Sequence, residues 1–159
     1  MKNITVGFSK HPGSLLSWLI RAVTKSKVSH VYQVIVVEGE PMVYQASGLM
    51  VNYTALPVFL EKNVVIEQYS MTVTDEQYEK AKKLRVTQVG KPYSVKQLFG
   101  FFYVLGMRKL GEQVRNPLGN GNHAYVCCEI IADSLGITDG ESMTPEDFRR
   151  YCERYGQRL

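Results

Sequence analysis

Apolar positions along the chain recur with two different periods, and these periods predict strands and helices. Alternating or β-branched apolar runs predict strands, whereas apolar residues spaced three and four apart predict helices. The predicted strands cover residues 4–8, 28–37, 42–46, 49–53 and 64–71. The predicted helices cover residues 15–23, 55–62, 74–89, 95–105, 127–135 and 145–155, and residues 106–122 are predicted to be irregular and mobile. We interpret these elements as one α+β domain, an antiparallel sheet flanked by helices.

Several helix ends carry recognisable capping residues. Ser14, Thr54 and Thr144 each stand where a side-chain oxygen can accept a hydrogen bond from the first turn. Thr74 and Gln77 have the spacing of a capping box. Pro145 suits the first turn of the last helix, and the predicted stops are Gly90, Gly136 and Gly156.

The helix over residues 15–23 has an unusually broad apolar face. Its apolar residues are Leu15, Leu16, Trp18, Leu19, Ile20, Ala22 and Val23. Two interpretations fit this breadth. Either the helix is pressed deep into the core, or it forms one wall of a groove.

Composition places the chain among globular proteins of one domain, residues 1–159. It is 45% hydrophobic and 21% charged, with a net charge of +4. The bases of helix 74–89 follow its acids, which matches the helix dipole, and no aromatic groove accompanies them. We therefore expect no nucleic-acid partner.

Two further features bear on the compartment in which the protein acts. Three cysteines, two of them adjacent, make a poor disulfide framework and favour a reducing compartment. The first residues lack the apolar core of a signal peptide, and the apolar run 98–105 is too short to cross a bilayer. We expect a cytoplasmic protein, or one delivered by a phage route.

Cys127 lies where a turn-rich loop, residues 116–122, gives way to a buried helix. Unpaired N–H groups and the dipole at a helix start lower the pKa of a thiol and can hold an oxyanion. The alternative is a small buried hydrophobic residue, a common role of free cysteine. A nucleophile needs a base, and His30, near the start of a buried strand, is the best of three histidines.

Five short stretches together resemble one family of enzymes. They are Ser29–Val31, Val43–Ala46 followed by Gly48, Gly90–Tyr93, Val126–Ile131 and Thr144–Phe148. They are similar to the circularly permuted branch of the NlpC/P60 papain-like cysteine hydrolases. That branch includes the YiiX-like and the lecithin:retinol acyltransferase-like proteins. In it, the histidine strand comes first and the cysteine helix comes late.

The resemblance implies a papain-like fold with Cys127 as nucleophile, His30 as base and Gln45 as the residue that orients the imidazole. Cys128 then takes a serine position of the family. Successive helical residues point about 100° apart, so Cys128 cannot face the same histidine and becomes a packing residue. Gln45 departs from the glutamate often found there, because an amide holds a tautomer but carries no charge. Alternatively, Gln45 faces solvent and Tyr44 faces inward.

Other polar residues have simpler interpretations. His123 either lines the cleft or is a solvated loop residue, and His11 lies in a Pro-Gly turn outside the predicted site. A zinc site made of His123, Cys127 and Cys128 has the wrong spacing for the usual patterns. Glu129 is a dipole partner in the first turn of its helix, and Cys152 lies in the last helix. We expect neither a metal nor an organic cofactor.

The resemblance predicts thiol-based acyl chemistry on an amide, in a peptide or in peptidoglycan. The alternatives are a lipid-directed hydrolase or acyltransferase, whose acyl groove the aromatic run 99–103 would line, and an inactive binding module of the same fold. A core helix explains the aromatic run more simply, and both Cys127 and His30 are present, so amide hydrolysis leads.

Overall fold

The computed structural model describes residues 1–112, 114–115, 117–118, 126–138 and 140–159, with the backbone alone for residues 95–99, 101 and 141. The strands are β1 (Lys2–Lys10), β2 (His30–Val37), β3 (Glu40–Ser47), β4 (Met50–Ala55), β5 (Val64–Val73) and β6 (Gln157–Arg158). The helices are α1 (Leu15–Thr24), α2 (Leu56–Lys62), α3 (Asp75–Gln88), α4 (Val95–Lys109), α5 (Cys127–Leu135), the short 3-10 helix η2 (Gly140–Ser142) and α6 (Pro145–Tyr155).

The strands form one sheet in the order β4-β3-β2-β1-β5-β6. Every neighbouring pair is antiparallel. The predicted α+β class, an antiparallel sheet flanked by helices, is therefore confirmed. The two-residue strand β6, which closes one edge, was not predicted, because its exposed polar residues carry no strand pattern.

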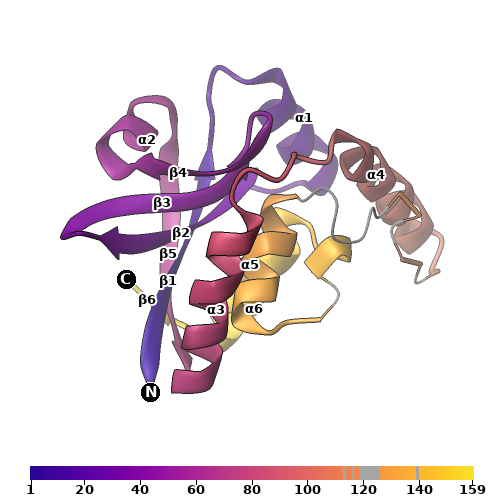
Figure 1. Cartoon of the computed structure of the whole chain (residues 1–159). Helices are drawn as coiled ribbons and strands as arrows, with labels where there is room; N and C mark the ends of the chain where they lie inside the picture. Colours follow the sequence, from indigo (N-terminus) through magenta and orange to yellow (C-terminus); the bar gives the residue numbers. More distant parts are fainter. Residues whose placement is uncertain (113, 116, 119–125, 139) are drawn as a thin grey trace.

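The two faces of the sheet are covered unequally. Helices α3, α5 and α6 pack on one face and enclose the main core, which includes Val31 and Tyr44 (Figure 1). The opposite face carries a smaller cluster of Tyr32, Val43 and Phe59 beneath α2. Neighbouring strand residues point to opposite faces, so β2 and β3 contribute to both clusters.

Three of the four predicted helix caps are confirmed. Ser14, Thr74 and Thr144 each accept a backbone N–H of the first turn. The fourth is wrong, because Ala55 occupies the cap position of α2 and Thr54 lies within β4. Helix α4 also continues to Lys109, so residues 106–109 are helical rather than irregular. Glycine at 106 costs only about 1 kcal/mol in a helix interior, which tertiary contacts can offset.

Helix α1 does not lie deep in the core, so that interpretation is wrong. Only Ser17 and Ile20 of α1 are buried, whereas Leu15 is 79% exposed and Trp18 57% exposed. Periodicity locates the apolar face of a helix but does not say which way that face turns. Among the described residues, no helix is long and apolar enough to cross a membrane.

Candidate active site

Cys127 is the first residue of α5, directly after the cap residue Val126. Helix α5 is fixed because nearly all of it is buried, with Ile130 and Ile131 fully enclosed by the main core. It packs against β2 and β3. The thiol therefore lies at a helix N-terminus that the core holds against the sheet, and the side chain of Cys127 is itself only 6% exposed.

His30 is the first residue of β2, and the structure brings its ring to Cys127. The thiol and the imidazole share a side-chain hydrogen bond. The backbone N–H of Val31 also donates to the Cys127 sulfur. The two side chains, far apart in sequence, thus meet where the start of β2 faces the start of α5.

Gln45 holds the other side of the imidazole. Its Oε1 lies 2.8 Å from His30 Nε2. The Gln45 amide nitrogen donates to Thr54 Oγ1 at 3.1 Å, and that hydroxyl donates onward to Asn52 Oδ1 at 3.0 Å. The Gln45 atom that faces His30 is therefore the oxygen. An amide oxygen only accepts, so Nε2 carries a proton and Nδ1 is the nitrogen left for Cys127.

The alternative in which Gln45 faces solvent is wrong. Gln45 is 6% exposed and points to the same face of the sheet as Asn52, the residue paired with it in the neighbouring strand β4. Tyr44 points to the opposite face, where its hydroxyl donates to Gln88 Oε1 at 2.7 Å. Both residues are buried because helices cover both faces here.

The imidazole also rests on aromatic rings. The Tyr32 and Phe59 ring centroids each lie 6.4 Å from the His30 ring, and Tyr32 is stacked with it. Tyr32 in turn lies over Gly7 of β1, where any Cβ would overlap its ring. Glycine at position 7 therefore allows the aromatic floor beneath His30 to form.

Electrostatics favour an ion pair between Cys127 and His30. The hydrogen bond from the Cys128 thiol, followed by the hydrogen bond and charge of His30, outweighs burial and holds the pKa of Cys127 well below its ordinary value. Burial lowers the pKa of His30, but the hydrogen bond and charge of Cys127 together with Gln45 raise it overall. The two shifts together favour thiolate and imidazolium.

The pKa values of the other two thiols, those of Cys128 and Cys152, are shifted in the opposite direction, which favours the protonated form. Burial, followed by the hydrogen bond and charge of Cys127, raises the pKa of Cys128 well above its ordinary value. Burial raises the pKa of Cys152 to about 12. Both side chains are buried in the main core. They behave as packing residues, and Cys128 also donates to the Cys127 sulfur.

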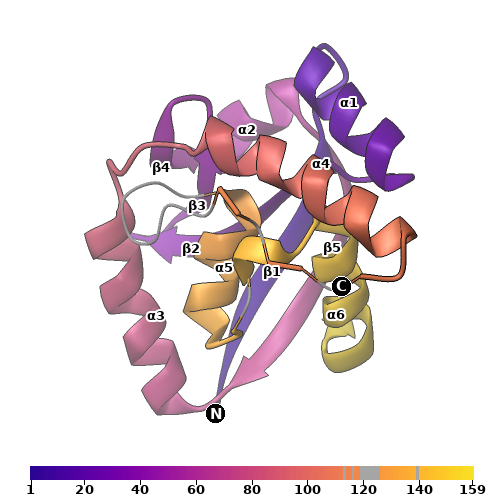
Figure 2. The same cartoon turned by 90° about the vertical axis from the view of Figure 1, so that its right-hand side faces the viewer.

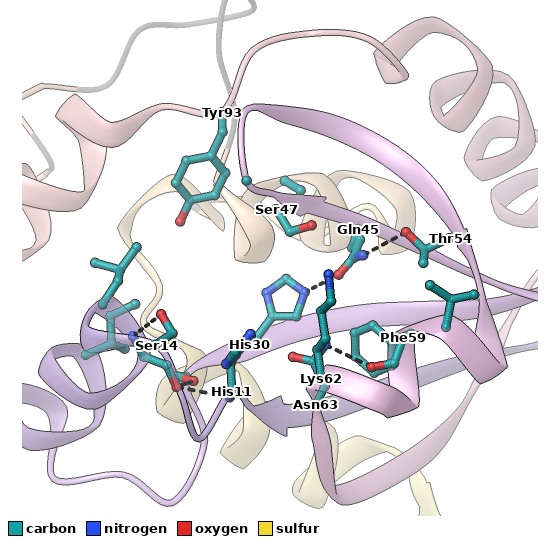
Figure 3. Close-up of a pocket in the computed structure, with 17 residues that line it drawn as sticks. His11, Ser14, His30, Gln45, Ser47, Thr54, Phe59, Lys62, Asn63 and Tyr93 are labelled. Carbon is teal, nitrogen blue, oxygen red and sulfur yellow. Dashed lines mark hydrogen bonds between the residues drawn. The ribbon is translucent and has the colours of Figure 1, made fainter.

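A cleft of about 530 Å³ opens beside the imidazole (Figure 3). Its lining includes His30 and Gln45, Leu16 and Ser17 of α1, and Val58 of α2, so the prediction that α1 forms a groove wall is confirmed. Cys127 lines a much smaller adjoining space of about 30 Å³. Ile20, Ser29 and Tyr93 line both spaces, so the two spaces adjoin at these residues.

Tyr93 is a site residue to which the sequence interpretation gave no role. Its ring projects into the cleft near His30 (Figure 3). Burial, with smaller contributions from the charges of Cys127 and Cys128, raises the pKa of its hydroxyl far above the ordinary value. The raised pKa favours the protonated hydroxyl, which can donate a hydrogen bond, and Tyr93 lines the same small space as Cys127. The signal was present in the stretch Gly90–Tyr93, which the family resemblance includes.

The remaining candidates have other positions. His11, which was expected outside the site, lines the same cleft as His30, and Glu129 is a first-turn residue whose Oε2 accepts from the N–H of Val126 at 3.4 Å. His123 is not among the described residues. In the described part of the chain, no group of three or more His, Cys, Asp or Glu side chains could hold a metal ion.

Comparison with known proteins identifies the fold. No family model matches the chain, and no curated protein matches its sequence. One solved structure that matches is the crystal structure of metalloprotein yiiX from Escherichia coli O157:H7, DUF1105. The similarity covers 86% of this chain and 67% of that chain, with 19% identity and a TM-score of 0.57. The chain has a YiiX-like fold. At this identity the likeness concerns the fold alone.

Proposed function

We propose that this protein is a cysteine hydrolase of the permuted NlpC/P60 type, formed by residues 1–159, that cleaves an amide bond in a peptide or in peptidoglycan. The observation that carries the proposal is the ordered contact of Cys127, His30 and Gln45 at the N-terminus of α5. A packing cysteine needs neither an imidazole nor a residue that fixes its tautomer. In the inactive-module alternative these contacts would have no use.

The proposed reaction has two steps. The Cys127 thiolate attacks the carbonyl carbon, and the backbone N–H groups at the start of α5 and the Tyr93 hydroxyl stabilise the oxyanion. The C–N bond then breaks, and His30 Nδ1 gives its proton to the leaving amine. In the second step His30 takes a proton from water, the hydroxide cleaves the thioester, and the carboxylic acid leaves with the thiolate restored.

Gln45 acts through His30. Its oxygen keeps the Nε2 proton in place, so the nitrogen that faces Cys127 is the one that exchanges protons. An amide adds no charge, and in this site the thiolate itself is the counter-charge of the imidazolium. Neither a metal nor an organic cofactor takes part in these steps.

The second candidate is a lipid-directed hydrolase or acyltransferase. The observation that favours it is the apolar rim of the cleft, where Leu16 is 40% exposed and Val58 49% exposed. The same thiol chemistry would act on an ester. Amide hydrolysis in the cytoplasm, or after delivery by a phage route, remains the leading proposal.

Trapping the acyl-enzyme tests the thiol chemistry directly. The protein is mixed with a panel of activated acyl amides and acyl esters, quenched in acid and analysed by mass spectrometry. We expect one acyl group on Cys127, removable by neutral hydroxylamine as a thioester should be. The matched controls are Cys127→Ala, which forms no adduct, and Cys152→Ala, which retains it. Acylation that persists in Cys127→Ala would contradict the proposal, and the preferred panel member separates amide from ester chemistry.

A further inference from the structure

Helix α1 turns most of its apolar residues outward, and only Ser17 and Ile20 of the helix are buried. The exposed residues include Leu15, Trp18 and Leu19. Ser17 faces the interior, where its hydroxyl shares a hydrogen bond with Ser29 Oγ at 2.6 Å. A helix at a protein–water boundary normally has the reverse arrangement. The outward face of α1 is therefore suited to an apolar surrounding.

The position of α1 leaves this face open. In both overall views α1 lies at the outer edge of the molecule (Figures 1 and 2). Its inner side, through Leu16, Ser17 and Ile20, lines the cleft. Across the cleft, α2 exposes Val58 and Leu60. Apolar side chains thus surround the mouth of the cleft on two sides.

The charge around α1 has one sign. Between Lys10 and Lys27 the chain carries no Asp or Glu, but it holds Arg21 and Lys25 as well as those two lysines. Lys25 and Lys27 are exposed. The acid closest to this segment, Glu146, accepts a hydrogen bond from Ser26 at 2.6 Å and is itself paired with Arg149 and Arg150.

We propose that α1 docks the protein on an anionic lipid bilayer, with Leu15, Trp18 and Leu19 inserted among the acyl chains and the surrounding cations on the headgroups. Apolar residues next to Trp and a basic border are the features of a helix that lies in a membrane interface. The interface lies parallel to the helix, so no spanning segment is required.

The charge argues against a second copy as the occupant. In a symmetric dimer the same patch meets itself, which brings Lys25 and Lys27 close to their equivalents with no acid in the segment to compensate. An anionic headgroup layer instead supplies compensating charge over the whole face. The docking concerns this surface alone and does not depend on the chemistry of Cys127.

The protein contains a built-in reporter of this docking, because Trp18 is its only tryptophan. Its emission is recorded with vesicles of phosphatidylcholine alone and with vesicles of phosphatidylcholine and phosphatidylglycerol, and binding is measured in parallel by co-sedimentation. With anionic vesicles we expect a blue shift and quenching by brominated acyl chains. Binding should weaken as salt rises from about 0.1 M to about 1 M, because the Debye length falls from about 10 Å to about 3 Å.

Matched variants separate apolar insertion from charge. Leu15→Ser with Leu19→Ser should abolish the blue shift, whereas Val86→Ser, at a 75% exposed position on α3, should leave it intact. Lys25→Gln with Lys27→Gln should weaken binding roughly fivefold for each lysine removed. The equivalent change at Lys80 and Lys83 of α3 should have no such effect.

Three outcomes would overturn the docking proposal. The first is the absence of a blue shift with anionic vesicles at low salt. The second is an equal shift in the Leu15→Ser, Leu19→Ser variant. The third is a shift that grows with protein concentration without vesicles, which would assign the face to a second copy of the chain. Cys127→Ala should bind vesicles as the native protein does, so failure of the hydrolase proposal would leave this result unchanged.

Discussion

Helices α1 and α5 both line the small space that adjoins the cleft, yet most of their apolar residues face in opposite directions. Helix α5 encloses Ile130 and Ile131 completely, whereas α1 exposes Leu15 and Trp18. The apolar residues of α5 therefore serve the fold and hold the first turn of the helix rigidly against β2. The exposed apolar residues of α1 contribute little to the fold, so they remain available for contact with something outside the chain.

Substitutions at matched positions in the two helices should differ strongly in stability. We expect Ile130→Ala to lower the free energy of unfolding by about 2–5 kcal/mol, because it leaves a cavity in the core. Leu15→Ala should change it by less than about 0.5 kcal/mol. Chemical denaturation measures both. Similar losses for the two variants would contradict the contrast between the helices.

Gln45→Ala tests whether the site needs a residue that holds the His30 imidazole as well as the buried helix that holds the thiol. We expect turnover to fall roughly ten- to a hundredfold with the fold retained, because the His30 tautomer is no longer fixed and the amide contributes no charge. Thr54→Val, which removes only the hydroxyl that receives the Gln45 amide, should have a smaller effect in the same direction. Unchanged turnover in Gln45→Ala would remove this residue from the mechanism.

The smallest effect is expected from replacing Cys128, which acts only on the adjacent Cys127 sulfur. Cys128→Ala removes the hydrogen bond that the Cys128 thiol makes to the Cys127 sulfur, so the pKa of Cys127 should rise. Cys128→Ser keeps a donor and should restore the lower value. The midpoint of the pH–alkylation curve of Cys127 reports this directly, and identical midpoints in Cys128→Ala and the native protein would make Cys128 a packing residue alone.

Features set by neighbouring residues could be predicted from the sequence. The capping box at Thr74, the cap at Thr144 and the stop at Gly136 are encoded within a few positions, and the structure has all three. The outward turn of α1 could not be predicted, because its periodicity fits burial and exposure equally well. Thr54 was misassigned because its hydroxyl bonds across strands to Gln45, a partner that no local pattern reveals.

In the site, too, local features could be predicted from the sequence, whereas contacts between distant residues could not be predicted from local patterns. The helix start at Cys127 is a local feature, but its contact with His30 spans most of the chain. The pairing was predicted by choosing the best of three histidines and by the family resemblance, not by any local pattern. That Gln45 rather than Tyr44 faces His30 depends on strand register, which alternation alone leaves open. Tyr93 received no role because its position beside the sulfur arises from the packing of its loop against the site.

The hydrogen bond of Cys128, followed by the hydrogen bond and charge of His30, favours the thiolate of Cys127, and the pH dependence of alkylation tests the part of His30 most directly. Iodoacetamide labelling of each cysteine is followed by peptide mass spectrometry across pH in the native protein and in His30→Ala. A lowered pKa means that the thiolate persists as pH falls, so Cys127 should react with a midpoint well below about 8.5 and ahead of Cys128 and Cys152. In His30→Ala the midpoint should move up toward the ordinary value. A native midpoint near about 8.5, or one that His30→Ala leaves unchanged, would contradict the account.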